Sequence, residues 1–148
     1  MTINFETIPV AELEKRKLEP DQSPTLPVVL VVGDEQAAAD SLVAILNRSG
    51  YAAEAAYDGK TALEMALLVP PELLLTDVAM PGMSGVELAI AVQKAVPDCR
   101  VLLLSEHPAS SDVPSDARNA GPDGFPVLVK PLHPDDLLVE ASRLFRQS

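Results

Sequence analysis

Residues 72–85 read ELLLTDVAMPGMSG, in which three leucines and a threonine lead into Asp77 and then into a proline–glycine pair. The leucine run predicts a strand over residues 72–76 that is buried on both faces, as strands of a parallel sheet are. The pair at 81–82 predicts a turn shortly after the strand ends. A carboxylate at the end of a buried strand therefore needs a chemical or structural reason.

The same type of apolar run recurs along the chain and alternates with helical patterns. Strands are predicted at residues 28–32, 51–57, 72–76, 100–105 and 127–130, and helices at 36–49, 61–69, 86–96 and 134–145. A fourth helix in the chain order, around residues 112–120, is predicted to be weak or displaced. Strict alternation favours an α/β fold, a three-layer (βα)5 sandwich of the flavodoxin type with parallel strand order 2-1-3-4-5. Residues 1–26 are predicted to be an N-terminal extension and linker, and residues 27–148 one domain.

Composition excludes several classes of protein. The chain has 148 residues, 47% of them hydrophobic, which is enough for one domain with a sizeable core. A net charge of -11 argues against a nucleic-acid partner, because binding phosphates requires a basic face. The single cysteine excludes an internal disulfide. No signal peptide and no apolar stretch long enough to span a membrane is evident, so we expect a cytoplasmic protein.

Polar residues stand at the ends of four predicted strands: Asp34 with Glu35, Asp77, Ser105 and Lys130. The carboxyl ends of parallel strands share one edge, where ligands bind in folds of this type. Two close carboxylates repel each other unless a cation lies between them, and Mg²⁺ is the cation that suits oxygen ligands and retained waters. Lys130 and the Ser105 hydroxyl could bind a phosphoryl group, with Asp77 as the nucleophile that accepts it.

Each of these residues also has a simpler interpretation when it is taken alone. Asp77 could stabilise the turn that follows it, and Asp34 could cap a helix. Ser105 could satisfy a loop backbone group, and Lys130 could be a solvated surface lysine. These interpretations explain single positions and not the set. We interpret Cys99 as inert and the two histidines as residues without a catalytic role.

Four segments together resemble the receiver domain of two-component response regulators: VVLVVGDE (28–35), LLLTDVAMPGMSGVEL (73–88), VLLLS (101–105) and VLVKP (127–131). The resemblance covers roughly residues 27–147 and implies a flavodoxin-like fold. It implies Asp77 as phosphoacceptor, Asp34 and the main-chain carbonyl of Ala79 as Mg²⁺ ligands, and Ser105 and Lys130 as phosphoryl contacts. It also implies that the peptide bond before Pro131 is cis.

The chain departs from the receiver pattern at two site positions. Gly33 aligns with the first of two acidic residues that usually end strand one, which predicts weaker Mg²⁺ binding. A shift by one residue, with Asp34 and Glu35 as the acidic pair, is the alternative. Val127 stands where receivers commonly carry the aromatic residue of the switch, so either Phe125 substitutes from an offset position or the coupling differs.

The resemblance implies a phosphorelay function without enzymatic turnover. The expected donor is a sensor histidine kinase or a histidine phosphotransfer protein, and the expected output is docking to a downstream protein by a single-domain receiver, with a homodimer as a further option. The alternative is a degenerate receiver that binds partners without phosphorylation. A phosphatase with an aspartyl-phosphate intermediate is disfavoured, because Ala79 replaces the second aspartate of such enzymes.

Overall fold

The computed structural model describes residues 26–106 and 124–146, in which strands and helices alternate along the chain. The elements are β1 Val28–Val32, α2 Gln36–Arg48, β2 Ala52–Ala56, α3 Gly59–Leu68, β3 Leu73–Asp77, α4 Gly85–Ala95, β4 Arg100–Ser105, β5 Val127–Val129 and α5 Pro134–Arg146. All four strand pairings are parallel, and the order is β2-β1-β3-β4-β5. The predicted fold and strand order are confirmed. The helix predicted near 112–120 and residues 1–25 of the predicted extension lie outside the described residues.

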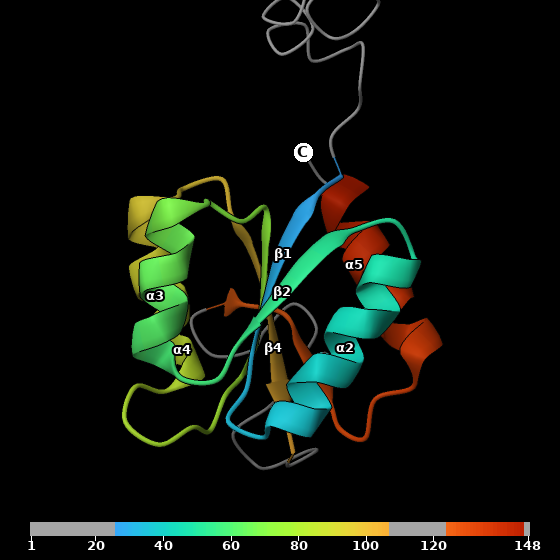
Figure 1. Ribbon diagram of the computed structural model, residues 1–148, viewed down its shortest axis with the longest axis horizontal. Coiled ribbons are helices and arrows are strands. Elements are labelled where there is room, and N and C mark those ends of the chain that lie inside the picture. The colour runs from blue at the N-terminus through green and yellow to red at the C-terminus, as the bar shows by residue number, and fades with distance from the viewer. Residues whose placement is uncertain (1–25, 107–123, 147–148) are drawn as a thin grey trace, which may run out of the picture.

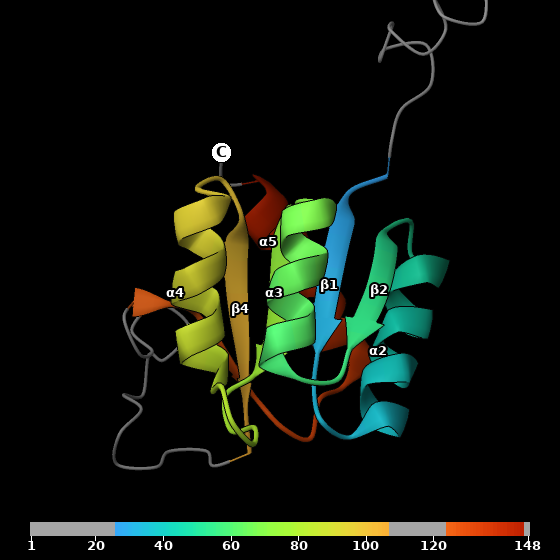
Figure 2. The ribbon, with the colours of Figure 1, turned by 60° about the vertical axis from the view of Figure 1, so that its left-hand side comes forward.

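The molecule has three layers, with α3 and α4 on one face of the sheet and α2 and α5 on the other (Figures 1 and 2). Side chains of a strand alternate between the two faces. On β1, Leu30 and Val32 pack in the core beneath α3 and α4, whereas Val29 and Val31 pack beneath α2 and α5. The central strands are therefore apolar on both sides, which explains their continuous runs of Leu and Val.

Local capping sets where the helices begin. Helix α3 starts at Gly59, two residues before the predicted start, because Asp58 Oδ1 accepts a hydrogen bond from the Thr61 N–H at 2.7 Å. Helix α4 starts at Gly85 behind a capping box. In it, Ser84 Oγ accepts from the Glu87 N–H at 3.1 Å and Glu87 Oε1 accepts from the Ser84 N–H at 3.0 Å. Such a box satisfies two backbone donors that the first helical turn leaves unpaired.

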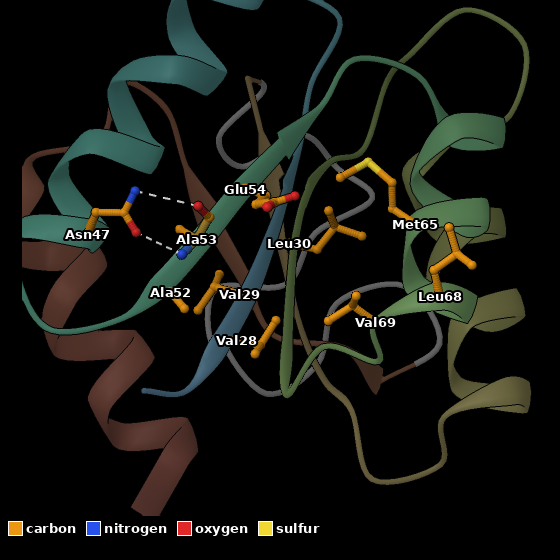
Figure 3. A pocket seen from close by; sticks show the side chains of 10 residues that line it. All are labelled: Val28, Val29, Leu30, Asn47, Ala52, Ala53, Glu54, Met65, Leu68 and Val69. Carbon is orange, nitrogen blue, oxygen red and sulfur yellow. Dashed lines mark hydrogen bonds between the residues drawn. The ribbon is translucent and has the colours of Figure 1, made fainter. Parts of the chain in front are cut away.

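Strand β2 is rich in alanine and has a weak propensity to form a strand, yet it is held on both sides. It pairs with β1 along its whole length. On its other side, the Asn47 side chain at the end of α2 bonds to Ala53 (Figure 3). The Ala53 N–H donates to Asn47 Oδ1 at 2.8 Å, and Asn47 Nδ2 donates to the Ala53 carbonyl at 3.5 Å. Tertiary contacts, and not propensity, therefore define this strand.

The strand register aligns the carboxyl ends of β3, β4 and β5. Asp77 lies opposite Leu104, Ser105 lies opposite Val129, and the Lys130 N–H donates to the Ser105 carbonyl at 2.8 Å. The last residue of β3 and the residue after β5 therefore meet at one edge of the sheet. Within the described ranges, no helix has the length and apolar character needed to cross a membrane.

Candidate phosphoryl-acceptor site

The centre of the site is an ion pair between β3 and the end of β5. Lys130 Nζ lies 2.8 Å from Asp77 Oδ1, a short charge-assisted contact. The Asp77 side chain is only 13% exposed and that of Lys130 22%, so both groups are screened from bulk water. The peptide bond between Lys130 and Pro131 is cis, as the family resemblance implies. The sequence predicts that these two side chains meet, and the structure brings them together.

The other predicted residues surround this pair. A cavity of about 270 Å³ is lined by Asp77 and Lys130 together with Asp34, Glu35, Val78, Ala79, Ser105 and Glu106. Every residue predicted for phosphoryl or metal binding is in this list. The list also contains Glu106, which the sequence analysis did not single out. The available signal was its position directly after a buried strand, the same signal that identified Asp77.

Burial is the main influence on the Asp77 carboxyl, and it raises the pKa of that group above its ordinary value. The hydrogen bond and the positive charge of Lys130 oppose that shift and lower the pKa in part. The negative charges of Asp34 and Glu106 raise the pKa further. Asp77 is thus a partly desolvated carboxylate that depends on a neighbouring cation, as expected of a reactive group at a functional site.

Because Gly33 has no side chain, the Asp77 carboxylate can lie directly beside it. The register places Val32 opposite Thr76, so Gly33 and Asp77 are the next positions along β1 and β3. A Cβ atom on Gly33 would lie 2.8 Å from Asp77 Oδ2, closer than a Cβ atom approaches an oxygen. Gly33, which is predicted to stand at the first acidic position of the receiver pattern, therefore also limits where the Asp77 carboxylate can lie.

Gly85 holds the main chain of Asp77 from the other side. A Cβ atom on Gly85 would lie 1.9 Å from the carbonyl oxygen of Asp77, and the Gly85 N–H donates to the Val78 carbonyl at 2.8 Å. This glycine, the first residue of α4, packs directly on the Asp77 backbone, which the sequence did not predict. The turn after Asp77 is made by Gly82, whose φ of +76° suits glycine.

The donor set fits a hard divalent cation. The carboxylates of Asp34 and Asp77 and the Ala79 carbonyl belong to residues of one cavity, and oxygen donors of this type suit Mg²⁺. Among residues 26–106 and 124–146, no group of three or more His, Cys, Asp or Glu side chains is arranged to hold a metal ion. An ion held here would therefore keep several water ligands, as Mg²⁺ commonly does.

Phe125 does not join the site. It is buried in the core, and it lines a hollow with Cys99, Arg100 and Val101 near the start of β4. Ser105 lies at the opposite end of that strand. Val127, at the position usual for the switch aromatic, is buried opposite Leu103. The described structure thus places no aromatic side chain from this segment beside Ser105.

Two further polar residues, His133 and Cys99, lie outside the site and have structural roles. His133 precedes α5, where its Nδ1 accepts a hydrogen bond from the Asp135 N–H at 3.1 Å. Cys99 is buried, and burial raises its pKa to about 12, so the thiol stays protonated at neutral pH. His107 lies outside the described residues.

A second hollow lies away from the polar edge, between α2 and α3 and against β1 and β2 (Figure 3). It measures about 470 Å³ and is lined mostly by apolar side chains, among them Val28, Leu30 and Leu68. Its charged lining residue is Glu54, and its amide residue Asn47 is already bonded to Ala53. It offers no nucleophile paired with a cation, so it does not compete as a site for phosphoryl chemistry.

Comparisons with known proteins agree with this geometry. A family model described as the response regulator receiver domain matches residues 29–142. Response regulator MprA of Mycobacterium ulcerans (strain Agy99) is 33% identical over 120 residues, which make up 81% of this chain and 50% of that protein. The chain therefore spans about half the length of the curated relatives it matches.

Solved structures give the same result. Chemotaxis protein CheY4 of Vibrio cholerae superposes with a TM-score of 0.70 and 28% identity, covering 81% of this chain and 99% of that chain. A CheY-like response regulator receiver domain protein from Methanospirillum hungatei JF-1 superposes with a TM-score of 0.69 and 30% identity, covering 83% of this chain and 97% of that chain. Because the family model matches most of the chain, residues 29–142, and the sheet has the strand order β2-β1-β3-β4-β5, the chain belongs to the response regulator receiver domain family.

Proposed function

We propose that this receiver domain accepts a phosphoryl group on Asp77 from a histidine kinase or a histidine phosphotransfer protein, and signals by docking to another protein. One observation carries the proposal: the Asp77 carboxylate is partly buried and lies 2.8 Å from Lys130, in a cavity that Asp34, Ala79 and Ser105 also line. The proposed nucleophile Asp77, the cation of Lys130 and the hydroxyl of Ser105 thus line the same cavity, where one phosphoryl group could contact all three.

The chemistry follows from these positions. An Asp77 carboxylate oxygen attacks the phosphorus of a phosphohistidine, so an O–P bond forms and the N–P bond breaks. The electron pair of the broken bond returns to the imidazole nitrogen, which takes up a proton. Lys130 faces the phosphoryl oxygens with a fixed positive charge, and the Ser105 hydroxyl donates to one of them. Positioning and charge neutralisation are the main requirements of phosphoryl transfer.

Asp34, Asp77 and the Ala79 carbonyl would hold Mg²⁺, with Glu35 as a further lining carboxylate. When bound, the ion neutralises charge that accumulates on the phosphoryl oxygens. Phosphotransfer with a kinase is expected in the cytoplasm. A net charge of -11 supports a protein and not a nucleic acid as the direct partner. The proposed role is that of a stoichiometric phosphoacceptor and not of an enzyme.

The test is incubation with acetyl phosphate and Mg²⁺, read by intact-mass spectrometry. Wild type is expected to gain the mass of one phosphoryl group, and Asp77→Asn none. Lys130→Ala keeps the nucleophile and is expected to be phosphorylated far more slowly. The proposal fails if wild type gains no mass from acetyl phosphate or from any phosphorylated histidine donor.

A second candidate function is phosphorylation-independent docking, which Gly33 favours because it removes one acidic side chain from the predicted metal site. In that case Asp77→Ala would bind its protein partner as tightly as wild type, with or without a phosphodonor. Affinities measured by calorimetry for the two proteins distinguish the candidates. Binding that requires a phosphodonor would exclude this second function.

A further inference from the structure

Glu106 is an acidic residue at the mouth of the site to which the proposed chemistry assigns no role. It directly follows β4 and lines two cavities that meet at Asp77 and Lys130, one of about 270 Å³ and one of about 300 Å³. Its Oε2 lies 3.9 Å from Lys130 Nζ, and its side chain is 67% exposed. Glu106 is therefore a solvent-exposed carboxylate beside the ion pair.

Lys130 is shared between two carboxylates. Asp77, at the end of β3, lies 2.8 Å from its Nζ, and Glu106, which follows the neighbouring strand β4, lies 3.9 Å from it. The lining of the smaller cavity carries one ammonium group against four carboxylates, those of Asp34, Glu35, Asp77 and Glu106. The positive charge that an incoming phosphoryl group would meet is thus partly neutralised before the group arrives.

Charge at this position matters for a phosphodonor because the donor is an anion. A unit charge several ångströms from an approaching anion changes its energy by about 1 kcal/mol when the intervening medium is mostly water. That corresponds to a change of about fivefold in a rate or an affinity, and salt screens it with a Debye length of about 10 Å at 0.1 M. Glu106 lies well within one Debye length of Lys130, so its charge changes the electrostatic potential at the site.

A role as a metal ligand does not explain Glu106. Its carboxylate contacts Lys130, the cationic side of the site, and not the carboxylates of Asp34 and Asp77 that are proposed to hold Mg²⁺. A purely structural role is also a poor explanation, because the side chain is mostly exposed and its ion pair with Lys130 is long, at 3.9 Å.

We propose that Glu106 is a specificity-determining residue whose carboxylate slows the access of small anionic phosphodonors to Asp77. The inference rests on the proposed function. A protein donor can place a cationic side chain against Glu106, whereas a small donor such as acetyl phosphate meets its charge unpaired. The residue therefore disfavours adventitious phosphorylation by small metabolites relative to phosphorylation by a partner protein.

The test compares phosphorylation rates with acetyl phosphate and Mg²⁺ for wild type, Glu106→Gln and Glu106→Asp, by intact mass. Glu64→Gln is the matched control, because it removes the same charge from an exposed position on α3 that lines neither cavity. At low ionic strength we expect Glu106→Gln to react about three- to tenfold faster than wild type. Glu106→Asp and Glu64→Gln should stay within about twofold of wild type, and salt near 0.5 M should remove most of the gain.

A binding measurement separates electrostatics from reactivity. Beryllofluoride is an anionic phosphoryl mimic, and its affinity in the presence of Mg²⁺ is measured by ¹⁹F NMR titration. We expect tighter binding to Glu106→Gln than to wild type, by a factor similar to the kinetic gain. Glu64→Gln should bind beryllofluoride as wild type does.

Two results would overturn the role of Glu106 and leave the proposed function standing. One is wild-type phosphorylation with an equal rate for Glu106→Gln at low salt. The other is a gain in Glu106→Gln that salt does not change, because that indicates a steric effect. Absence of both phosphorylation and beryllofluoride binding in wild type and variants would overturn the two proposals together.

Discussion

Two glycines border Asp77, one against its carboxylate and one against its carbonyl. Gly33 lies where a Cβ would come 2.8 Å from Asp77 Oδ2, and Gly85 where a Cβ would come 1.9 Å from the Asp77 carbonyl oxygen. The first contact involves the end of a side chain that can rotate. The second involves backbone, which cannot move without shifting β3 or α4. The two positions therefore differ in how well they would tolerate a side chain.

Gly85→Ala is expected to destabilise the protein by about 2–3 kcal/mol, the upper part of the range for overpacking, because the clash is with backbone. It should also lower the phosphorylation rate, because relief of the clash moves Asp77. Gly82→Ala is the control: no atom lies within 4 Å of its Cβ position, and its positive φ alone costs about 1 kcal/mol. Urea denaturation measures the free energy of unfolding of both variants. Equal losses of stability for the two variants would contradict the close packing of Gly85 on Asp77.

At the residue scale, the chemistry of the site was predictable and its detailed geometry was not. Asp77 and Lys130 each follow a recognisable strand, so a parallel sheet brings them together. Phe125, which precedes Val127 by two residues, was one of two options for the switch, and a different coupling was the other. At roughly 3.3 Å per strand residue, that offset moves it away from the polar edge. Glu106 directly follows a buried strand, the same signal that identified Asp77, but its approach to Lys130 at 3.9 Å depends on side-chain positions that the spacing does not encode.

At the scale of elements, the apolar strands were the easiest to predict and β2 was the hardest. Runs such as VVLVV and LLL fit strands buried on both faces. The segment AAEAA of β2 has no such signal and was placed only because the alternation required a strand there. Its stability comes from pairing with β1 and from Asn47, and both are tertiary contacts.

Asn47→Ala is expected to cost about 1–2 kcal/mol of stability, because Ala53 is buried and its N–H loses the Oδ1 partner at 2.8 Å. The gain in helix propensity on going to alanine offsets part of the loss. Gln36→Ala, at the exposed start of the same helix, should change stability by less than about 0.5 kcal/mol. Thermal unfolding followed by circular dichroism compares the variants. If Asn47→Ala loses no more stability than Gln36→Ala, the hydrogen bonds between Asn47 and Ala53 do not stabilise the fold.

At the scale of the whole molecule, charge connects stability to ligand binding. The chain carries a net charge of -11, so its acidic groups repel one another and added salt of any kind relieves that repulsion. A bound cation adds a site-specific gain to this general effect. The two contributions can be separated, because only the specific one depends on Asp34.

Mg²⁺ is expected to raise the Tm of wild type by a few degrees more than NaCl of equal ionic strength does. Binding at about ten times Kd stabilises the folded state by about 1.4 kcal/mol, which for a domain of this size is roughly 3–5 °C. Asp34→Asn should lose most of this excess. Asp98→Asn removes the same charge from an exposed position that does not line the cavity at Asp77. This variant should keep the excess rise in Tm with Mg²⁺. If Mg²⁺ and NaCl give the same Tm, the proposed cation site is wrong.

Strand β2 forms an outer edge of the sheet, and an unpaired edge can recruit a strand from another molecule. In this protein the Asn47 amide occupies the hydrogen-bonding groups of Ala53, and exposed Glu54 places a charge in the middle of the strand. Both features oppose intermolecular β-sheet growth, although the segment's small side chains would otherwise allow tight stacking. The same asparagine that fixes β2 in the fold is thus also expected to hinder aggregation through this edge.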